Sequence, residues 1–259
     1  AFLVGCGNST TPTADVSTYT ATIVKTDYGI PHITANSWGS LGFGEAYSAA
    51  EDHVCNIALA LVQSRGESAA AFGPGRNNRN TSRDIVVKAL GIPERATAAL
   101  EAQEPDIREW IEGYTAGYNQ FLEEKAGNHG SWCKDEDWVR PVTTSEVMAQ
   151  YVTLVDTLPR ISGALVAAQP PQGAAPEEDQ IAKAINAAPT VEATLSDMKL
   201  RDMGSNAWAI AAKRSEDGRG LLLANPHYPW YGIARFWEKH LTIPGKYNAY
   251  GAGLIVTPG

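Results

Sequence analysis

A glycine followed by a hydroxyl residue, Gly204-Ser205, opens the part of the chain whose residue types could perform catalysis. After the serine, Asn206, Trp208 and Ile210 alternate with alanines, which is the pattern of a strand with two distinct faces. If the bond before Ser205 were cut, the serine would begin a new chain and carry a free α-amine beside its own hydroxyl. An α-amine has an ordinary pKa of about 8, which suits a general base near neutral pH. One residue would then supply both the nucleophile and its base.

A histidine surrounded by aromatic residues follows the serine. Residues 221–230 read LLLANPHYPW, and residues 235–246 read RFWEKHLTIPGK. A neutral imidazole at His227 could hydrogen-bond the α-amine, or its water, and tune its basicity. By itself, a histidine between Pro226 and Tyr228 is more often structural, and a lone Gly-Ser dipeptide most often lies in a loop.

Three separated motifs in the first half of the chain accompany this region. They are YGIPHI at residues 28–33, GFGEAY at residues 42–47 and RGE at residues 65–67. Together with Gly204-Ser205 and the stretches after it, they resemble the penicillin acylase family of N-terminal-nucleophile hydrolases. The similarity is to the branch that contains acyl-homoserine-lactone acylases and aculeacin-type lipopeptide acylases. It covers most of the chain and is weakest from about residue 164 to residue 201.

The resemblance implies an amide-bond acylase made as a single precursor and cleaved between Gly204 and Ser205 into α and β subunits. Glycine suits the position before the nucleophile because a Cβ would oppose the strained peptide that cleavage requires. The mature Ser205 would form an acyl ester that water hydrolyses. The expected substrates are N-acyl homoserine lactones or other fatty-acyl amides, and the alternative is a penicillin, cephalosporin or lipopeptide acylase of the same family.

The resemblance also implies roles for residues after the serine. His227 falls where this branch places a histidine near the nucleophile. Tyr228 falls in the wall of the acyl pocket, where related acylases tend to carry phenylalanine, and its hydroxyl needs a partner or water. Trp230 either lines the same pocket or packs elsewhere. Trp208 is expected in the core. Arg235 could hold a carboxylate or a lactone carbonyl, and an ion pair with Glu238 or another acid is the alternative.

The donors that stabilise the oxyanion would, by resemblance, be a backbone amide and an asparagine that both fall past Gly259. The residues up to Gly259 are therefore expected to lack activity by themselves. No cofactor is expected. Calcium binding occurs in some family members, but its ligands also fall largely downstream, and no Asp-rich loop here requires it. A non-catalytic binding lipoprotein with the same fold stays open. A Ser-His-Asp hydrolase is disfavoured because no Gly-x-Ser-x-Gly elbow surrounds Ser205.

Composition narrows the class of protein. With 259 residues, 44% of them hydrophobic and 19% charged, the chain has the balance of a globular protein with room for one large domain or two small ones. A net charge of -8 argues against nonspecific binding to nucleic acid, which needs a basic surface. No run of eighteen apolar residues is present, so no membrane-spanning helix is expected.

The three cysteines bear on the compartment. The tetrapeptide before and including Cys6 reads LVGC and resembles a bacterial lipobox, whose cysteine carries lipid after signal-peptide cleavage. Residues 7–17 are rich in Ser, Thr and Pro, as a tether would be. These features predict a lipid-anchored periplasmic protein of a bacterium; an ordinary terminal cysteine is the alternative. Cys55 and Cys133 would pair in an oxidising compartment, or else lie buried as free thiols.

The same patterns predict the elements that position these residues. Strands are expected at 19–26 and 30–35, followed by a helix that starts near Trp38, capped by Asn36 or Ser37. Further helices are expected at about 49–63, over most of 90–125 with a break near Pro105, and at 144–158. Gly42 and Gly44 would weaken the first helix, which indicates close packing there. Trp110, Tyr114 and Tyr118 recur on one helical face and are expected in the core.

After the candidate nucleophile, strands are expected at 205–212, 220–225, 234–243 and 247–254, as an antiparallel meander of three hairpins. The fold class is therefore α+β, and the resemblance implies the four-layer αββα sandwich of N-terminal-nucleophile hydrolases, here as a fragment with the α subunit, the spacer and the start of the β subunit. The expected divisions are a signal-peptide end and tether at 1–18, a mostly helical α-subunit region at 19–170, a spacer at 171–204, and β-subunit strands at 205–259.

Overall fold

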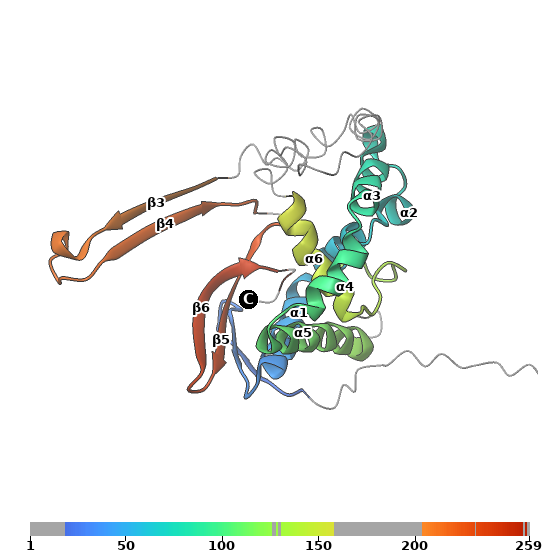
Figure 1. The fold of residues 1–259 in the computed structure, drawn as a ribbon. Helices are drawn as coiled ribbons and strands as arrows, with labels where there is room; N and C mark the ends of the chain where they lie inside the picture. The colour runs from blue at the N-terminus through green and yellow to red at the C-terminus, as the bar shows by residue number, and fades with distance from the viewer. Residues whose placement is uncertain are drawn as a thin grey trace, which may run out of the picture.

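The structure is a computed structural model that describes residues 19–125, 128, 131–157, 204–230, 232–255 and 257. The predicted lipid-anchor residue Cys6 and its tether lie outside the described residues. So does the predicted spacer, apart from its last residue. In Figure 1, the helices gather beside the β5–β6 hairpin, and the β3–β4 ribbon extends away from them. The described residues thus form a mixed α+β structure, as predicted.

One sheet combines strands from both sides of Gly204-Ser205. Its order is β1-β2-β5-β6. The β1–β2 and β5–β6 pairs are antiparallel hairpins, and β2 pairs with β5 in parallel. The first hairpin turns through Gly29, whose φ of 82° favours glycine. The four strands are Thr22–Lys25 (β1), Pro31–Thr34 (β2), Phe236–Ile243 (β5) and Tyr247–Leu254 (β6).

The candidate nucleophile lies in a separate two-stranded sheet. Strand β3 (Gly204–Ile210) pairs with β4 (Leu221–His227) in antiparallel orientation. The predicted meander of three hairpins is wrong at its middle, because β4 and β5 do not pair within the described part of the chain. An alternating sequence identifies a strand but not its neighbour, and here β5 pairs instead with β2, far away in the sequence.

Helix α1 (Trp38–Ser64) begins at the predicted position. Its N-cap is Ser37, whose side chain accepts a hydrogen bond from the Ser40 backbone N–H at 3.2 Å. The two helices expected on either side of residue 49 are one helix with an interruption at His53, where φ is -144° and ψ is 22°. The other helices are α2 (Ser68–Phe72), η2 (Arg76–Asn78), α3 (Arg79–Ala89), α4 (Ile92–Glu101), α5 (Pro105–Lys125), α6 (Thr144–Thr157) and η4 (Ala212–Arg214).

Helices α1 and α5 touch through their backbones. A Cβ added at Gly113 would lie 1.8 Å from the Gly39 carbonyl oxygen, and one at Gly117 would lie 2.1 Å from that of Phe43. A Cβ at Gly42 would meet the Trp110 carbonyl oxygen at 2.2 Å. The close packing predicted from the glycines of α1 is therefore confirmed, and glycines of α5 complete it.

The core fills the space between these helices and one face of the four-stranded sheet. Trp110, Tyr114 and Tyr118 are all buried there, as their helical spacing predicts. The Tyr114 hydroxyl donates a hydrogen bond to the Ile255 carbonyl at 2.9 Å, so the core joins α5 to the end of the β6 segment. Side chains of β5 alternate, with Leu241 buried and Glu238 exposed.

The predicted disulfide is present between Cys55 and Cys133. It joins α1 to the segment before α6, with 5.6 Å between the Cα atoms and a sequence separation of 78. On the chain-entropy account, closing a loop of this length stabilises the fold by about 4 kcal/mol.

Among the described helices, none combines the length and the apolar composition needed to cross a lipid bilayer.

Candidate functional site

The register of the β3–β4 ribbon brings the candidate catalytic residues together. The Cα atom of Gly204 lies opposite that of His227, and Ser205 lies opposite Pro226. Opposite Cα atoms in an antiparallel pair are about 4.5–5.5 Å apart. The peptide between Gly204 and Ser205 therefore lies within reach of one side chain on the neighbouring strand. The strand register alone establishes that this peptide lies close to His227.

The His227 ring has one polar neighbour on the ribbon. Its Nε2 atom lies 3.5 Å from the Asn206 side-chain nitrogen, at the outer limit of a hydrogen bond. An amide nitrogen only donates, so Nε2 is the acceptor in this contact when the ring bears its proton on Nδ1. The ring is half-buried, which leaves it accessible to a ligand.

The ribbon itself is exposed. Trp208, which the sequence placed in the core, has 60% of its surface exposed, and Leu222 on the partner strand has 72%. Large apolar side chains lie on both faces of the ribbon, and no other described element covers them. Contiguous exposed apolar surface of this kind marks a region that other protein or ligand surface covers.

The two residues predicted to line an acyl pocket differ in their surroundings. Tyr228 is half-buried and stacks on Phe236, with ring centroids 4.6 Å apart and an interplanar angle of 21°. Trp230 is 92% exposed. Sequence reasoning missed Phe236, although an aromatic residue at the start of a predicted strand, next to Arg235, was an available signal. The pocket roles of Tyr228 and Trp230 stay predictions.

Arg235 reaches back to α1 instead of pairing with Glu238. Its Nη2 atom hydrogen-bonds Nδ1 of His53, the residue that interrupts the helix. Burial, and next the positive charge of Arg235, lower the pKa of His53 to about 4. The imidazole is therefore neutral near pH 7, and its Nδ1 accepts the hydrogen bond from the guanidinium. Neither residue pattern nor spacing indicated His53 as a partner, because the contact joins distant parts of the chain.

Nearby polar contacts join the same two parts of the chain. Asp52 accepts a hydrogen bond from the Trp237 indole N–H at 3.3 Å and from the Lys25 ammonium at 3.0 Å. Lys25 also forms an ion pair with Glu51 at 3.2 Å. The end of the loop that follows His227 and the start of β5 are thus anchored by side chains of α1.

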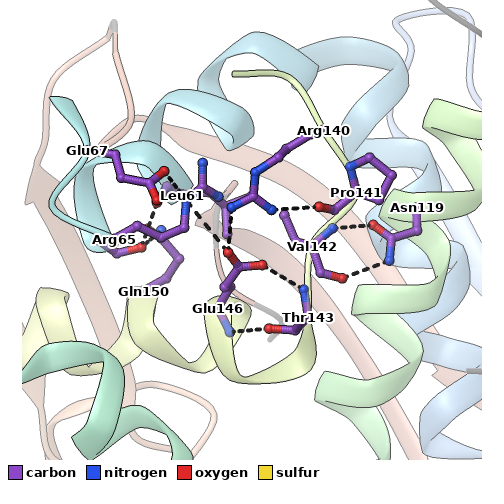
Figure 2. A network of polar contacts seen from close by, with 11 residues as sticks. Leu61, Arg65, Glu67, Asn119, Arg140, Pro141, Val142, Thr143, Glu146 and Gln150 are labelled. Carbon is purple, nitrogen blue, oxygen red and sulfur yellow. Dashed lines mark hydrogen bonds and ion pairs between the residues drawn. The ribbon is translucent and has the colours of Figure 1, made fainter. Parts of the chain in front are cut away.

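The RGE motif has a structural role in the helical region (Figure 2). Arg65 lies between two carboxylates, 2.7 Å from Glu67 and 3.7 Å from Glu146, and Arg140 binds Glu146 at 2.9 Å. Glu146 also accepts the Thr143 backbone N–H at 2.8 Å, and Thr143 Oγ1 accepts that of Glu146 at 3.3 Å. This reciprocal capping box starts α6 and holds it at the end of α1.

These interactions stabilise the ionised form of Glu146. Burial alone would raise its pKa, but the hydrogen bonds from Arg140 and the Thr143 backbone, with the charges of Arg140 and Arg65, lower it overall.

The described residues offer no metal site. No three side chains of His, Cys, Asp or Glu gather among them in a way that could hold an ion. Calcium binding, which the family resemblance raised, stays a prediction.

Comparison with known proteins gives consistent matches. A family model described as penicillin amidase matches residues 20–259. The acyl-homoserine lactone acylase PvdQ of Pseudomonas fluorescens (strain Pf0-1) is 37% identical over 248 residues, covering 92% of this chain and 31% of the relative. Aculeacin-A acylase of Actinoplanes utahensis is 38% identical over 255 residues, covering 93% of this chain and 31% of the relative.

The chain spans about a third of the length of these curated relatives. A solved structure of a thermostable penicillin G acylase from Alcaligenes faecalis aligns with a TM-score of 0.49 and 23% identity, covering 69% of this chain and 90% of that one. Because that similarity is low, the family assignment rests on the sequence matches.

Proposed function

The chain belongs to the penicillin amidase family, and from this premise we propose that the protein is an amide-bond acylase precursor that cleaves itself between Gly204 and Ser205. The observation that carries the proposal is the register of the β3–β4 ribbon, which sets His227 opposite the peptide to be cut.

In the cleavage step, the Ser205 hydroxyl oxygen attacks the Gly204 carbonyl carbon. The hydroxyl proton passes to the peptide nitrogen as the C–N bond breaks, which leaves an ester and a free α-amine. Water then hydrolyses the ester, so that Gly204 ends in a carboxylate and Ser205 regains its hydroxyl. Glycine before the serine removes the Cβ that would hinder this rearrangement.

In turnover, the freed α-amine accepts the proton of the Ser205 hydroxyl, whose oxygen attacks the acyl carbon of the substrate. The proton passes to the leaving amine, and the acyl group remains as an ester on Ser205. A water molecule, deprotonated by the same α-amine, releases the carboxylic acid. His227 orients the amine or its water through a hydrogen bond to a ring nitrogen.

The proposed substrates are N-acyl homoserine lactones or related fatty-acyl amides, and lipopeptide or β-lactam acyl amides are the alternative. The names of the relatives support this class, and so does the apolar pair of Tyr228 and Phe236 beside His227. Apolar walls discriminate one methylene by only about 1 kcal/mol, so chain-length preference has to be measured.

The proposed assembly is an αβ heterodimer made from one precursor, lipid-anchored through Cys6 in the bacterial periplasm. The disulfide between Cys55 and Cys133 supports an oxidising compartment. No cofactor and no nucleic-acid partner enter the proposal.

Intact mass of the polypeptides made from the complete gene, with its signal peptide, tests the proposal. We expect a chain that begins at Ser205 and a smaller partner that ends before it. The Ser205→Ala variant should remain one uncut chain without acylase activity, whereas Ser145→Ala in α6 should be cut like the natural protein. Efficient cleavage of the Ser205→Ala variant would overturn the proposal, and an uncut natural chain would favour a non-catalytic binding lipoprotein.

A further inference from the structure

Two opposite charges lie fully inside the contact between α1 and β5. Glu45 of α1 is 0% exposed and Lys239 of β5 is 4% exposed. The Lys239 ammonium forms an ion pair and a hydrogen bond with one Glu45 carboxylate oxygen. The other carboxylate oxygen accepts the Trp110 indole N–H from α5 at 2.8 Å. The pair therefore joins a residue that precedes Ser205 in the chain to one that follows it.

A buried ion pair is a poor source of stability. The loss of hydration offsets much of the attraction, and well-packed apolar residues of similar volume often stabilise a fold equally well. Removing only one partner, in contrast, is strongly unfavourable because it leaves an uncompensated charge. The pair instead specifies how β5 is aligned along β2, because it forms only when Lys239 lies beneath Glu45.

The other inward-facing side chains of β5 are apolar, and among them only Trp237 has a directional contact of its own in the described structure, the hydrogen bond to Asp52. Trp237, Leu241 and Ile243 are all buried on that face, at every second position around Lys239. Sliding β5 along β2 by two residues keeps the same side chains inward, because side chains alternate with a period of two. The slide would place an apolar side chain beneath Glu45 and bury Lys239 without its partner.

We propose that the Glu45–Lys239 ion pair determines the register in which β5 pairs with β2. The partner that this surface of α1 and β2 recognises is the chain's own segment from Phe236 to Leu254, and it accepts that segment in one alignment. Where the inference concerns two separate chains it rests on the proposed cleavage, after which the same surface would hold the β-subunit segment.

The register matters for the candidate site because the loop from His227 leads directly into β5. A slide of two residues moves the strand by about 6.6 Å. That distance would separate Arg235 from His53 and Trp237 from Asp52. The ion pair, although distant in sequence from Ser205, therefore acts as a positioning device for the loop after His227.

Cysteine cross-linking tests the register in the complete protein. Thr34 and Thr242 are opposite each other in the observed register, so Thr34→Cys with Thr242→Cys reports the native alignment. Thr34→Cys with His240→Cys reports the alignment that is shifted by two residues. Both reporter pairs are placed in the natural protein and in a variant with Glu45→Leu and Lys239→Met, and the cross-linked peptides are quantified by mass.

In the natural protein, we expect the shifted cross-link at no more than about a tenth of the native one, and in the apolar variant we expect that ratio to rise roughly tenfold. Glu45→Gln with Lys239→Gln keeps a directional hydrogen bond and should retain the native ratio. A second apolar pair, Glu45→Met with Lys239→Leu, separates a packing defect from the loss of the charges. If both apolar variants show the native cross-link alone, or if neither folds, the proposal is wrong.

The peptide masses do not depend on whether the chain is cut. An uncut natural chain with a native cross-link would therefore overturn the proposed self-cleavage without contradicting the proposed role of the Glu45–Lys239 pair. A normally cut chain whose apolar variants keep the native register would support self-cleavage and overturn the proposed role of the ion pair.

Discussion

The β1-β2-β5-β6 sheet and the β3–β4 ribbon differ in how far their side chains are buried and in which other elements cover them. The sheet has one face buried against α1 and α5, and its two hairpins are joined by the parallel pairing of β2 with β5. The ribbon pairs only with itself among the described elements and exposes apolar side chains on both faces. Within the described residues, the sheet therefore carries most of the packing, and the candidate nucleophile lies on the exposed ribbon.

Breaking the contact between α1 and α5 is the largest change that we predict. In Gly113→Val, the new side chain would start 1.8 Å from the Gly39 carbonyl oxygen, so the two helices have to separate. We expect a loss of about 4 kcal/mol or more in the free energy of unfolding, measured by denaturant titration followed by circular dichroism.

The matched control is on the ribbon. Gly220→Ala places its Cβ 3.6 Å from the Ile210 carbonyl oxygen, which is ordinary contact. It should change the same free energy by less than about 0.5 kcal/mol. Equal effects of the two substitutions would contradict the contrast between a packed sheet and an exposed ribbon.

Removing the disulfide has the next largest expected effect. The double variant Cys55→Ala and Cys133→Ala releases a loop with a sequence separation of 78, and should lower the free energy of unfolding by about 2–4 kcal/mol. Reduction of the natural protein should reproduce the loss. An unchanged midpoint under reducing conditions would show that helix packing alone restrains this loop.

The smallest predicted effect is a pH dependence from His53. Its pKa of about 4 in the folded protein lies below the ordinary value of 6.5, so the unfolded chain binds a proton more readily between these values. The contribution of this residue to stability is therefore complete above pH 6.5 and declines as the pH falls toward 4. For a partly exposed group we expect about 1–2 kcal/mol.

A single variant isolates this effect. His53→Asn keeps a hydrogen-bond acceptor for Arg235 and removes the titration. Unfolding measured at pH 7 and pH 4.5 should show a smaller loss in the variant than in the natural protein. Parallel losses in both proteins would assign the pH dependence to other titratable groups.

Local signals in the sequence predicted most elements of the fold. Ser37 is a side-chain cap that acts within one turn, and the aromatic residues of α5 recur at helical spacing, so both are visible in a short window. The parallel pairing of β2 with β5 was missed because it depends on contacts between distant residues. The interruption at His53 was missed as well, since no proline or glycine marks it.

The candidate site divides in the same way. The pairing of β3 with β4 was predicted as a hairpin, but the predicted second strand ended at residue 225, whereas β4 runs on to His227 and so brings it opposite Gly204. The contact between Arg235 and His53 spans most of the chain and could not be inferred from spacing. The core position predicted for Trp208 failed because alternation shows that a strand has two faces, not which elements cover them.

The parallel pairing of His32 with His240 joins residues 208 positions apart. While the chain is continuous, its two parts meet at a high effective concentration, because a tether keeps them together. Once the peptide before Ser205 is cut, the tether is gone and only the lifetime of the interface keeps the parts together. The uncut chain thus assembles the interface while its two parts are still tethered. Dilution or mild denaturation after the cut would separate the two parts, and they would pair again only slowly.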